Sequence, residues 1–136
     1  MATKFTAAAK NDIRNRTRAD VTLHACPRWA VTRRAQARGL MFRRPGPDDC
    51  LVFPFLPAQV ARLHMWFVFG PIDVVCLDGR GIVVALKERF RPWMYWSSGV
   101  PVSCAIELPV GTILRTGTRV GDRVVLPRPP LPARSR

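Results

Sequence analysis

The sequence has no apolar run of about 20 residues, the length that a membrane-spanning helix requires. Its N-terminus is positively charged but lacks the apolar segment of a secretory signal, so we expect a cytoplasmic protein with no transmembrane segment. The four cysteines lie far apart in the sequence and form no C-x-x-C pair. Metal sites usually bring two ligands close together, so we expect no metal and no cofactor, and cysteines that act as reduced, buried apolar side chains.

Motifs for nucleophilic or phosphate chemistry are also lacking. No serine lies in a G-x-S-x-G turn, and the glycine-rich stretch 111–121 lacks the Lys-Ser/Thr pair of a phosphate-binding loop. A complete catalytic set is therefore missing. The sequence predicts no catalytic residue and favours a non-enzymatic protein over an enzyme.

Helical periodicity is scarce, and 13 prolines interrupt the 136 residues too often for a helical bundle. We expect one helix over 30–41, capped by Thr32 and stopped by Gly39. Short apolar or alternating segments are typical of strands, and Asp78-Gly79 predicts a hairpin turn. The expected strands are 21–26, 50–55, 63–69, 72–78, 82–90 and 102–109, with two more within 111–127. The fold class is mainly β, a compact sandwich-like or barrel-like domain of about seven or eight short strands with one short helix.

The net charge of +13 is concentrated toward the two ends of the chain. We divide the chain into a basic N-terminal arm (1–20), a β-rich domain (21–126) and a Pro/Arg-rich tail (127–136). Basic arms suit RNA or another polyanion, although they also occur as merely solvated tails. The contacts would come from Lys4, Lys10, Arg14, Arg16, Arg18 and the Arg128–Arg136 tail.

Several short motifs follow one another through the β-rich part: RRAQARGLMFRR, LVFPF, His64 with PIDVVCLDGRG, RPW, IELPVGT and VGDRVV. Together, over about residues 30–126, they resemble the bacterial and archaeal family called domain of unknown function 192, in its branch with a His before Pro-Ile-Asp. The resemblance implies a single small, mainly β domain and no particular activity, because the family is uncharacterised. The residues that match are Gly39–Leu40–Met41, His64, Pro71–Ile72–Asp73, Leu77–Asp78, Glu107–Leu108–Pro109, Gly111 and Gly121–Asp122.

Three positions depart from that branch. Cys76 replaces its usual Phe, Val68 its usual Met, and Met94 its usual Arg after Pro-Trp. The absence of this Arg argues against anion binding at the site.

Polar residues within apolar segments are the first candidate site. If strands 63–69 and 72–78 bend at Gly70-Pro71, His64 and Asp73 can meet, and Glu107 can join them for acid–base or metal chemistry. The competing interpretation is structural: a carboxylate in an apolar strand, such as Asp73, Glu107 or Asp122, accepts hydrogen bonds from nearby backbone N–H groups. We favour the structural interpretation and keep a hydrolytic or metal-dependent enzyme as an alternative.

Aromatic residues are the second candidate site. The segment RPWMYWSSG predicts a loop that carries Trp93, Tyr95 and Trp96. Trp66 and Phe67 add exposed aromatic rings, and Arg91 adds a cation. Such side chains bind a protein or a glycan, or pack in the core instead. The leading hypothesis is a non-enzymatic binding or accessory module that uses this aromatic surface.

Overall fold

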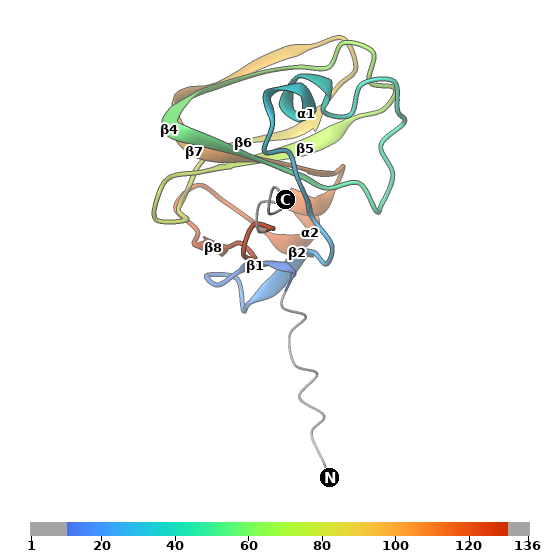
Figure 1. The fold of residues 1–136 in the computed structure, drawn as a ribbon. Helices are drawn as coiled ribbons and strands as arrows, with labels where there is room; N and C mark the ends of the chain where they lie inside the picture. The colour runs from blue at the N-terminus through green and yellow to red at the C-terminus, as the bar shows by residue number, and fades with distance from the viewer. Residues whose placement is uncertain (1–10, 131–136) are drawn as a thin grey trace.

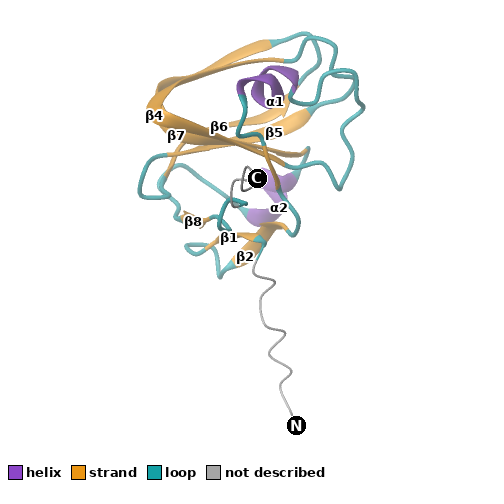
Figure 2. Cartoon of the chain, viewed as in Figure 1, coloured by secondary structure: helices purple, strands orange, loops and turns teal. Residues whose placement is uncertain are grey.

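The computed structural model describes residues 11–130, which form eight strands and two short helices (Figures 1 and 2). No helix of this part is long and apolar enough to cross a membrane, since α1 has six residues and α2 has five. The elements in chain order are β1 (Ile13–Asn15), β2 (Val21–His24), β3 (Arg28–Trp29), α1 (Arg33–Arg38), β4 (Leu51–His64), β5 (Ile72–Leu77), β6 (Val83–Phe90), β7 (Tyr95–Pro109), α2 (Thr112–Thr116) and β8 (Val124–Val125).

The strands form two sheets. The large sheet has the order β3-β4-β7-β5-β6, and the small sheet has the order β2-β1-β8. All pairs within them are antiparallel except β3 with β4. The long β4–β7 ribbon bends where its register shifts between Pro54 and Gln59, and it folds back over α1, whereas α2 and the small sheet lie on the other side of the large sheet (Figure 1). The predicted mainly β, sandwich-like fold is confirmed, and the described sheets do not close into a barrel.

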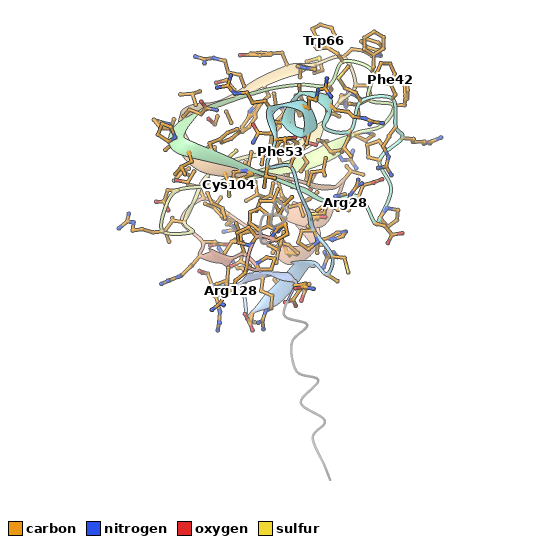
Figure 3. All side chains as sticks on the ribbon, viewed as in Figure 1. Arg28, Phe42, Phe53, Trp66, Cys104 and Arg128 are labelled. Carbon is orange, nitrogen blue, oxygen red and sulfur yellow. The ribbon has the colours of Figure 1, made fainter. Side chains whose placement is uncertain are left out.

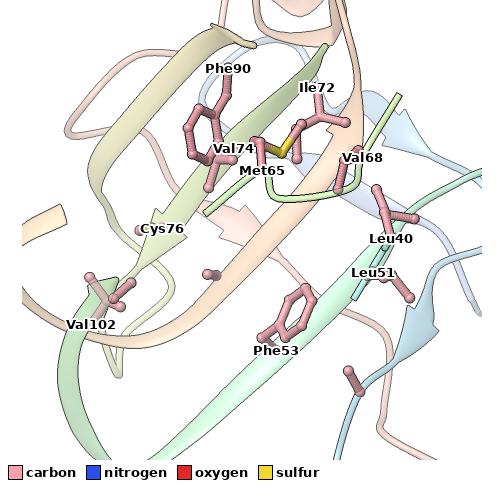
Figure 4. Close-up of a cluster of buried hydrophobic side chains, with 13 residues drawn as sticks. Leu40, Leu51, Phe53, Met65, Val68, Ile72, Val74, Cys76, Phe90 and Val102 are labelled. Carbon is pink, nitrogen blue, oxygen red and sulfur yellow. The ribbon is translucent and has the colours of Figure 1, made fainter. Parts of the chain in front are cut away.

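Two apolar cores lie on opposite faces of the large sheet, because successive strand residues point to opposite sides. Phe53 and its β7 partner Ala105 belong to the core next to α1, whereas Val52 and its partner Ile106 belong to the core next to the small sheet. The first core also takes in Leu40, Met65 and Val68 from loops (Figure 4). Over Cys104–Leu108, each side chain of β7 thus faces one core or the other according to its position in the strand.

The helix prediction is correct in its caps and too long in its bounds. The Thr32 hydroxyl accepts a hydrogen bond from the Ala35 N–H at 3.0 Å, and Gly39 ends α1 with a positive φ of 45°. The DGRG turn is also confirmed: the Asp78 N–H donates to the Ile82 carbonyl at 2.9 Å.

Two predicted strand regions are wrong. Of the expected strand 63–69, only Leu63 and His64 are strand residues, because β4 ends at His64 and the following segment turns, with Phe67 at a φ of 58°. This apolar run reads as a strand in sequence, yet its Met65 and Val68 fold down onto the core as a lid. In 111–127, α2 replaces the first expected strand, since Thr112, Ile113 and Thr116 bury one side of a helical turn.

Two further segments are more extended than expected. Residues 56–62 continue β4 rather than forming a connection, and the expected loop 91–99 becomes strand β7 from Tyr95 onward. At the N-terminus, β1 lies within the span expected to be an arm and pairs with both β2 and β8. The folded part therefore reaches back at least to Ile13, whereas Lys4, Lys10 and residues 131–136 lie outside the described residues.

Candidate functional site

Asp73 is a buried carboxylate held by two backbone N–H groups. Its Oδ1 accepts from Arg89 N at 3.1 Å and its Oδ2 accepts from Ile113 N at 2.9 Å. Both oxygens therefore have partners, and the side chain ties β6 and α2 to β5. This geometry is what the structural interpretation of Asp73 requires.

Asp122 is the centre of a second buried polar cluster. It accepts from Asn15 Nδ2 (3.0 Å), from Arg18 Nε (2.9 Å) and from the Arg119 N–H (3.0 Å). Burial alone raises the pKa of Asp122, but these hydrogen bonds and the Arg18 charge bring it below its ordinary value. The cluster fastens β1 to the turn before β8.

The expected set of His64, Asp73 and Glu107 does not assemble. In β5 and β7, Val74 is the register partner of Glu107 and Asp73 is the partner of Leu108, so Asp73 and Glu107 point to opposite faces of the large sheet. His64 is exposed, and its Nδ1 accepts from the Trp66 N–H at 3.3 Å. The enzyme alternative required these three side chains to meet in one site, and the structure does not bring them together. Within residues 11–130, no group of three or more His, Cys, Asp or Glu is placed to hold a metal ion.

Glu107 instead lines a small cavity beside α1. Burial raises the pKa of Glu107 to about 7, and its Oε2 has no hydrogen-bond partner among the described residues. The cavity has a volume of about 170 Å³, and His64 lines it as well. Its other lining residues come from the end of α1, the turn after it, the end of β4 and the lid: Gln36, Ala37, Arg38, Gly39, Leu40, Met41, Arg62, Leu63, Met65 and Val68.

A cluster of four aromatic rings lies next to this cavity on the surface. We call Phe42, Trp66, Phe67 and Trp93 the aromatic cluster; Phe42 and Trp66 are labelled at the top of Figure 3. Phe67 stacks on Phe42 with centroids 5.3 Å apart and meets Trp93 edge-on at 4.9 Å, while Trp66 and Trp93 are 6.1 Å apart. Each ring belongs to a residue that is 44–66% exposed.

The remaining aromatic candidates occupy a different feature. Arg91, Tyr95 and Trp96 line a groove of about 420 Å³. Its charged lining also includes Lys87, Arg89 and one acid, Glu88, so the groove has three basic side chains against one acidic side chain. The structure thus divides the six residues expected as one surface: Trp66, Phe67 and Trp93 belong to the aromatic cluster, and the other three belong to this basic groove. Sequence reasoning missed Phe42, whose only signal is that it is a large apolar residue beside a turn.

Three members of the aromatic cluster have strained backbones. Phe42, Phe67 and Trp93 have φ values of 62°, 58° and 65°, a region that non-glycine residues rarely adopt. Such strain persists where surrounding contacts impose it, and it is concentrated at functional sites. The surrounding contacts therefore hold the three loops in one defined arrangement, as is typical of a functional surface.

Comparison with known proteins adds the family. The model of DUF192, described as an uncharacterized ACR, matches residues 14–126. A UPF0127 protein of Thermococcus sibiricus is 39% identical over 90 residues, covering 64% of this chain and 56% of that protein, so the match spans little more than half of the relative. A UPF0127 protein of Pyrococcus abyssi is 34% identical over 89 residues, covering 65% of this chain and 75% of its own length.

Two crystal structures share the fold. A protein of Sinorhizobium meliloti described as a candidate transcription regulator has a TM-score of 0.74 and 28% identity, with 84% of this chain and 91% of that chain covered. A protein of unknown function from Novosphingobium aromaticivorans has a TM-score of 0.67 and 25% identity, with 73% of each chain covered. The family model covers most of the chain and agrees with the motif resemblance, and this chain belongs to the DUF192 family.

Proposed function

We propose that this chain is a non-enzymatic binding module that holds a partner protein on the aromatic cluster. The observation that carries the proposal is the contiguous exposure of four large rings, which a protein without a partner rarely presents to water. Aromatic side chains also supply much of the binding energy at protein interfaces.

Backbone hydrogen bonds fix the three loops that carry the cluster. Phe42 N donates to the Phe67 carbonyl at 2.6 Å, and Trp93 N donates to the Met65 carbonyl at 2.8 Å. Met65 N in turn donates to the Met94 carbonyl at 2.8 Å. Segments far apart in the sequence are thus joined into one platform. A platform ordered before binding loses less conformational entropy when a partner docks.

The ring geometry favours a protein over a glycan. Sugars stack on flat faces, whereas Trp93 is tilted by 62° to Trp66 and by 68° to Phe67. The resulting surface is uneven and apolar, which suits the side chains of a protein segment. The three buried free thiols, Cys50, Cys76 and Cys104, suit a reducing compartment such as the cytoplasm.

A photo-crosslinking experiment in cells tests this proposal. A photoreactive phenylalanine analogue replaces Met94, which is 55% exposed beside Trp93, and in a control chain it replaces Leu114, which is 80% exposed on α2. We expect a discrete crosslinked protein from position 94 only, abolished by Trp93→Ala and by Trp66→Ala. Identical products from both positions, or a product that survives both tryptophan substitutions, would contradict the proposal.

A second candidate function is polyanion binding, favoured by the basic groove. Lys87, Arg89 and Arg91 beside Tyr95 and Trp96 combine cations with stacking rings, the combination used for single-stranded nucleic acid. The likeness to a candidate transcription regulator agrees with this function. The N-terminal arm offers fewer free cations than its sequence indicates, since three of its arginines are ion-paired: Arg14 with Asp20 at 2.8 Å, Arg16 with Asp20 at 3.6 Å and Arg18 with Asp122 at 2.9 Å.

Fluorescence anisotropy with a labelled single-stranded oligonucleotide tests the second candidate. We expect affinity to fall steeply between roughly 50 and 200 mM salt, as phosphate contacts require. Arg89→Gln with Arg91→Gln should reduce both the affinity and the salt slope, whereas the exposed control Arg123→Gln should leave the groove's contribution unchanged. Binding that is insensitive to the paired groove substitutions would exclude the groove as the nucleic-acid site.

A further inference from the structure

We propose that the cavity beside α1 binds a small amino carboxylate, with its ammonium group against Glu107 inside and its carboxylate against Arg38 and Arg62 at the opening. The site is separate from the aromatic cluster and does not depend on what that cluster binds.

The first argument is the state of Glu107. Its residue is 7% exposed, and its Oε2 is buried without a partner among residues 11–130. Asp73 and Asp122, the other buried carboxylates of the motif set, each accept two or more hydrogen bonds. A buried acceptor without a donor is unfavourable. Of these three carboxylates, Glu107 is therefore the one with a buried oxygen that accepts no hydrogen bond. It lines a cavity that can admit a ligand with a donor group.

The second argument is size. The cavity volume of about 170 Å³ is close to that of cavities of roughly 150 Å³ that hold a benzene molecule. It suits a ligand of about six to ten non-hydrogen atoms. Buried Leu40, Met65 and Val68 supply an apolar wall for a short carbon chain.

The third argument is the distribution of charge. Arg38 projects from α1 and Arg62 from β4, both are exposed, and neither forms an ion pair with the other described residues. His64 from β4 also lines the cavity. Burial raises the pKa of the nearby Cys50 thiol to about 12, and the charge of Glu107 adds to this rise. A ligand with only a carboxylate would be repelled by Glu107 inside the cavity. A ligand with only an amine would be repelled by the two arginines at the opening. A molecule that carries both groups satisfies both ends of the cavity.

The cavity also gathers residues that are scattered in the sequence. Gly39, Leu40 and Met41, His64, and Glu107 belong to three separate motifs of the family resemblance, and all five line this one space. Asp73 and Asp122, which belong to the same set of motifs, have complete structural roles elsewhere. The motif residues thus fall into two groups, one that holds the fold together and one that surrounds the cavity.

Calorimetric titration of the full chain at pH 8 with four probes of similar size tests the proposal. The probes are 5-aminopentanoate, its isomer L-norvaline, pentylamine and pentanoate, which separate the contributions of the two charged ends. We expect one or both amino carboxylates to bind at least tenfold more tightly than either probe with a single charged group. Glu107→Gln should weaken that binding at least tenfold, Arg62→Gln should weaken it severalfold, and the exposed control Glu88→Gln should leave it unchanged.

Proton release gives a readout that a purely structural Glu107 would not move. Burial raises the pKa of Glu107 to about 7, and an ammonium partner favours the charged carboxylate, so binding near pH 7 should release protons in the wild type and not in Glu107→Gln. Titration in two buffers of different ionisation enthalpy measures this release, with circular dichroism as the check that the variant is folded. No heat from any probe at 10 mM would overturn the proposal, as would equal binding by Glu107→Gln or by the singly charged probes.

Discussion

Replacing Glu107 by Gln should stabilise the folded protein at neutral and alkaline pH. The folded-state pKa of Glu107 is about 7 because burial disfavours the charged carboxylate, against an ordinary value of 4.5. The folded protein therefore binds this proton more tightly than the unfolded chain does. The resulting penalty is absent below about pH 4.5, grows as the pH rises to about 7, and is complete above it.

The gap between the two pKa values corresponds to about 3 kcal/mol, at roughly 1.4 kcal/mol per pH unit. Glu107→Gln removes the charge while keeping the shape, so we expect its free energy of unfolding to exceed that of the wild type by up to this amount at pH 8. The two proteins should have equal stability near pH 4.5. The melting temperature at pH 8 should rise by roughly 10 °C.

Urea unfolding followed by tryptophan fluorescence, repeated between pH 4.5 and 8.5, measures the difference directly. Glu88→Gln provides the matched control, because Glu88 is exposed and its substitution should change stability by less than about 0.5 kcal/mol at every pH. A difference between Glu107→Gln and wild type that does not vary with pH would refute the reasoning. So would a less stable variant at pH 8, since it would mean that the charged carboxylate has a favourable partner inside the fold.

The other predictions concern the structural residues and the thiols. Asp73→Ala should destabilise the protein by about 3 kcal/mol in urea unfolding, because it leaves one buried and one partly buried N–H group without an acceptor. Gly81→Ala should destabilise the protein by more than about 2 kcal/mol in the same assay, because the new Cβ would lie 2.7 Å from the Val124 carbonyl oxygen at a φ of 81°. Gly117→Ala is the matched control: its φ is also positive but its Cβ would meet open space, so it should cost about 1 kcal/mol. A thiol reagent should modify Cys26 alone in the native protein, because burial raises the pKa of each of the other three thiols to about 12; rapid reaction of a second thiol would contradict this.

Local signals were sufficient to predict most strands and the helix caps. The Asp78-Gly79 turn and the Thr32 cap depend on backbone conformation within a few residues, and both are confirmed. The segment 65–69 was mispredicted because a turn that buries Met65 and Val68 has the same apolar composition as a buried strand. In such a case, only the packing of the segment against the rest of the chain distinguishes the two.

The candidate site could be predicted only in part, because it depends on register. Asp73 and Glu107 are each apolar-strand carboxylates, and nothing local indicates on which face of the sheet they lie. The pairing of Val74 with Glu107 sets the two on opposite faces, and a shift of one residue would have brought them together. The aromatic cluster likewise depends on long-range pairing, since Phe42, Phe67 and Trp93 come together only through the contacts between their loops.

The left-handed backbone at Phe42, Phe67 and Trp93 has a consequence for the selection of variants. Glycine adopts this conformation without the cost of about 1–2 kcal/mol that other residues incur. A library screened only for resistance to heat should therefore enrich glycine at these positions and erase the exposed rings. A library screened in cells for retained function should keep them, if the rings bind a partner. The two screens would then disagree at three surface positions that are far apart in the sequence, and the disagreement would outline the binding surface even while its partner is still unidentified.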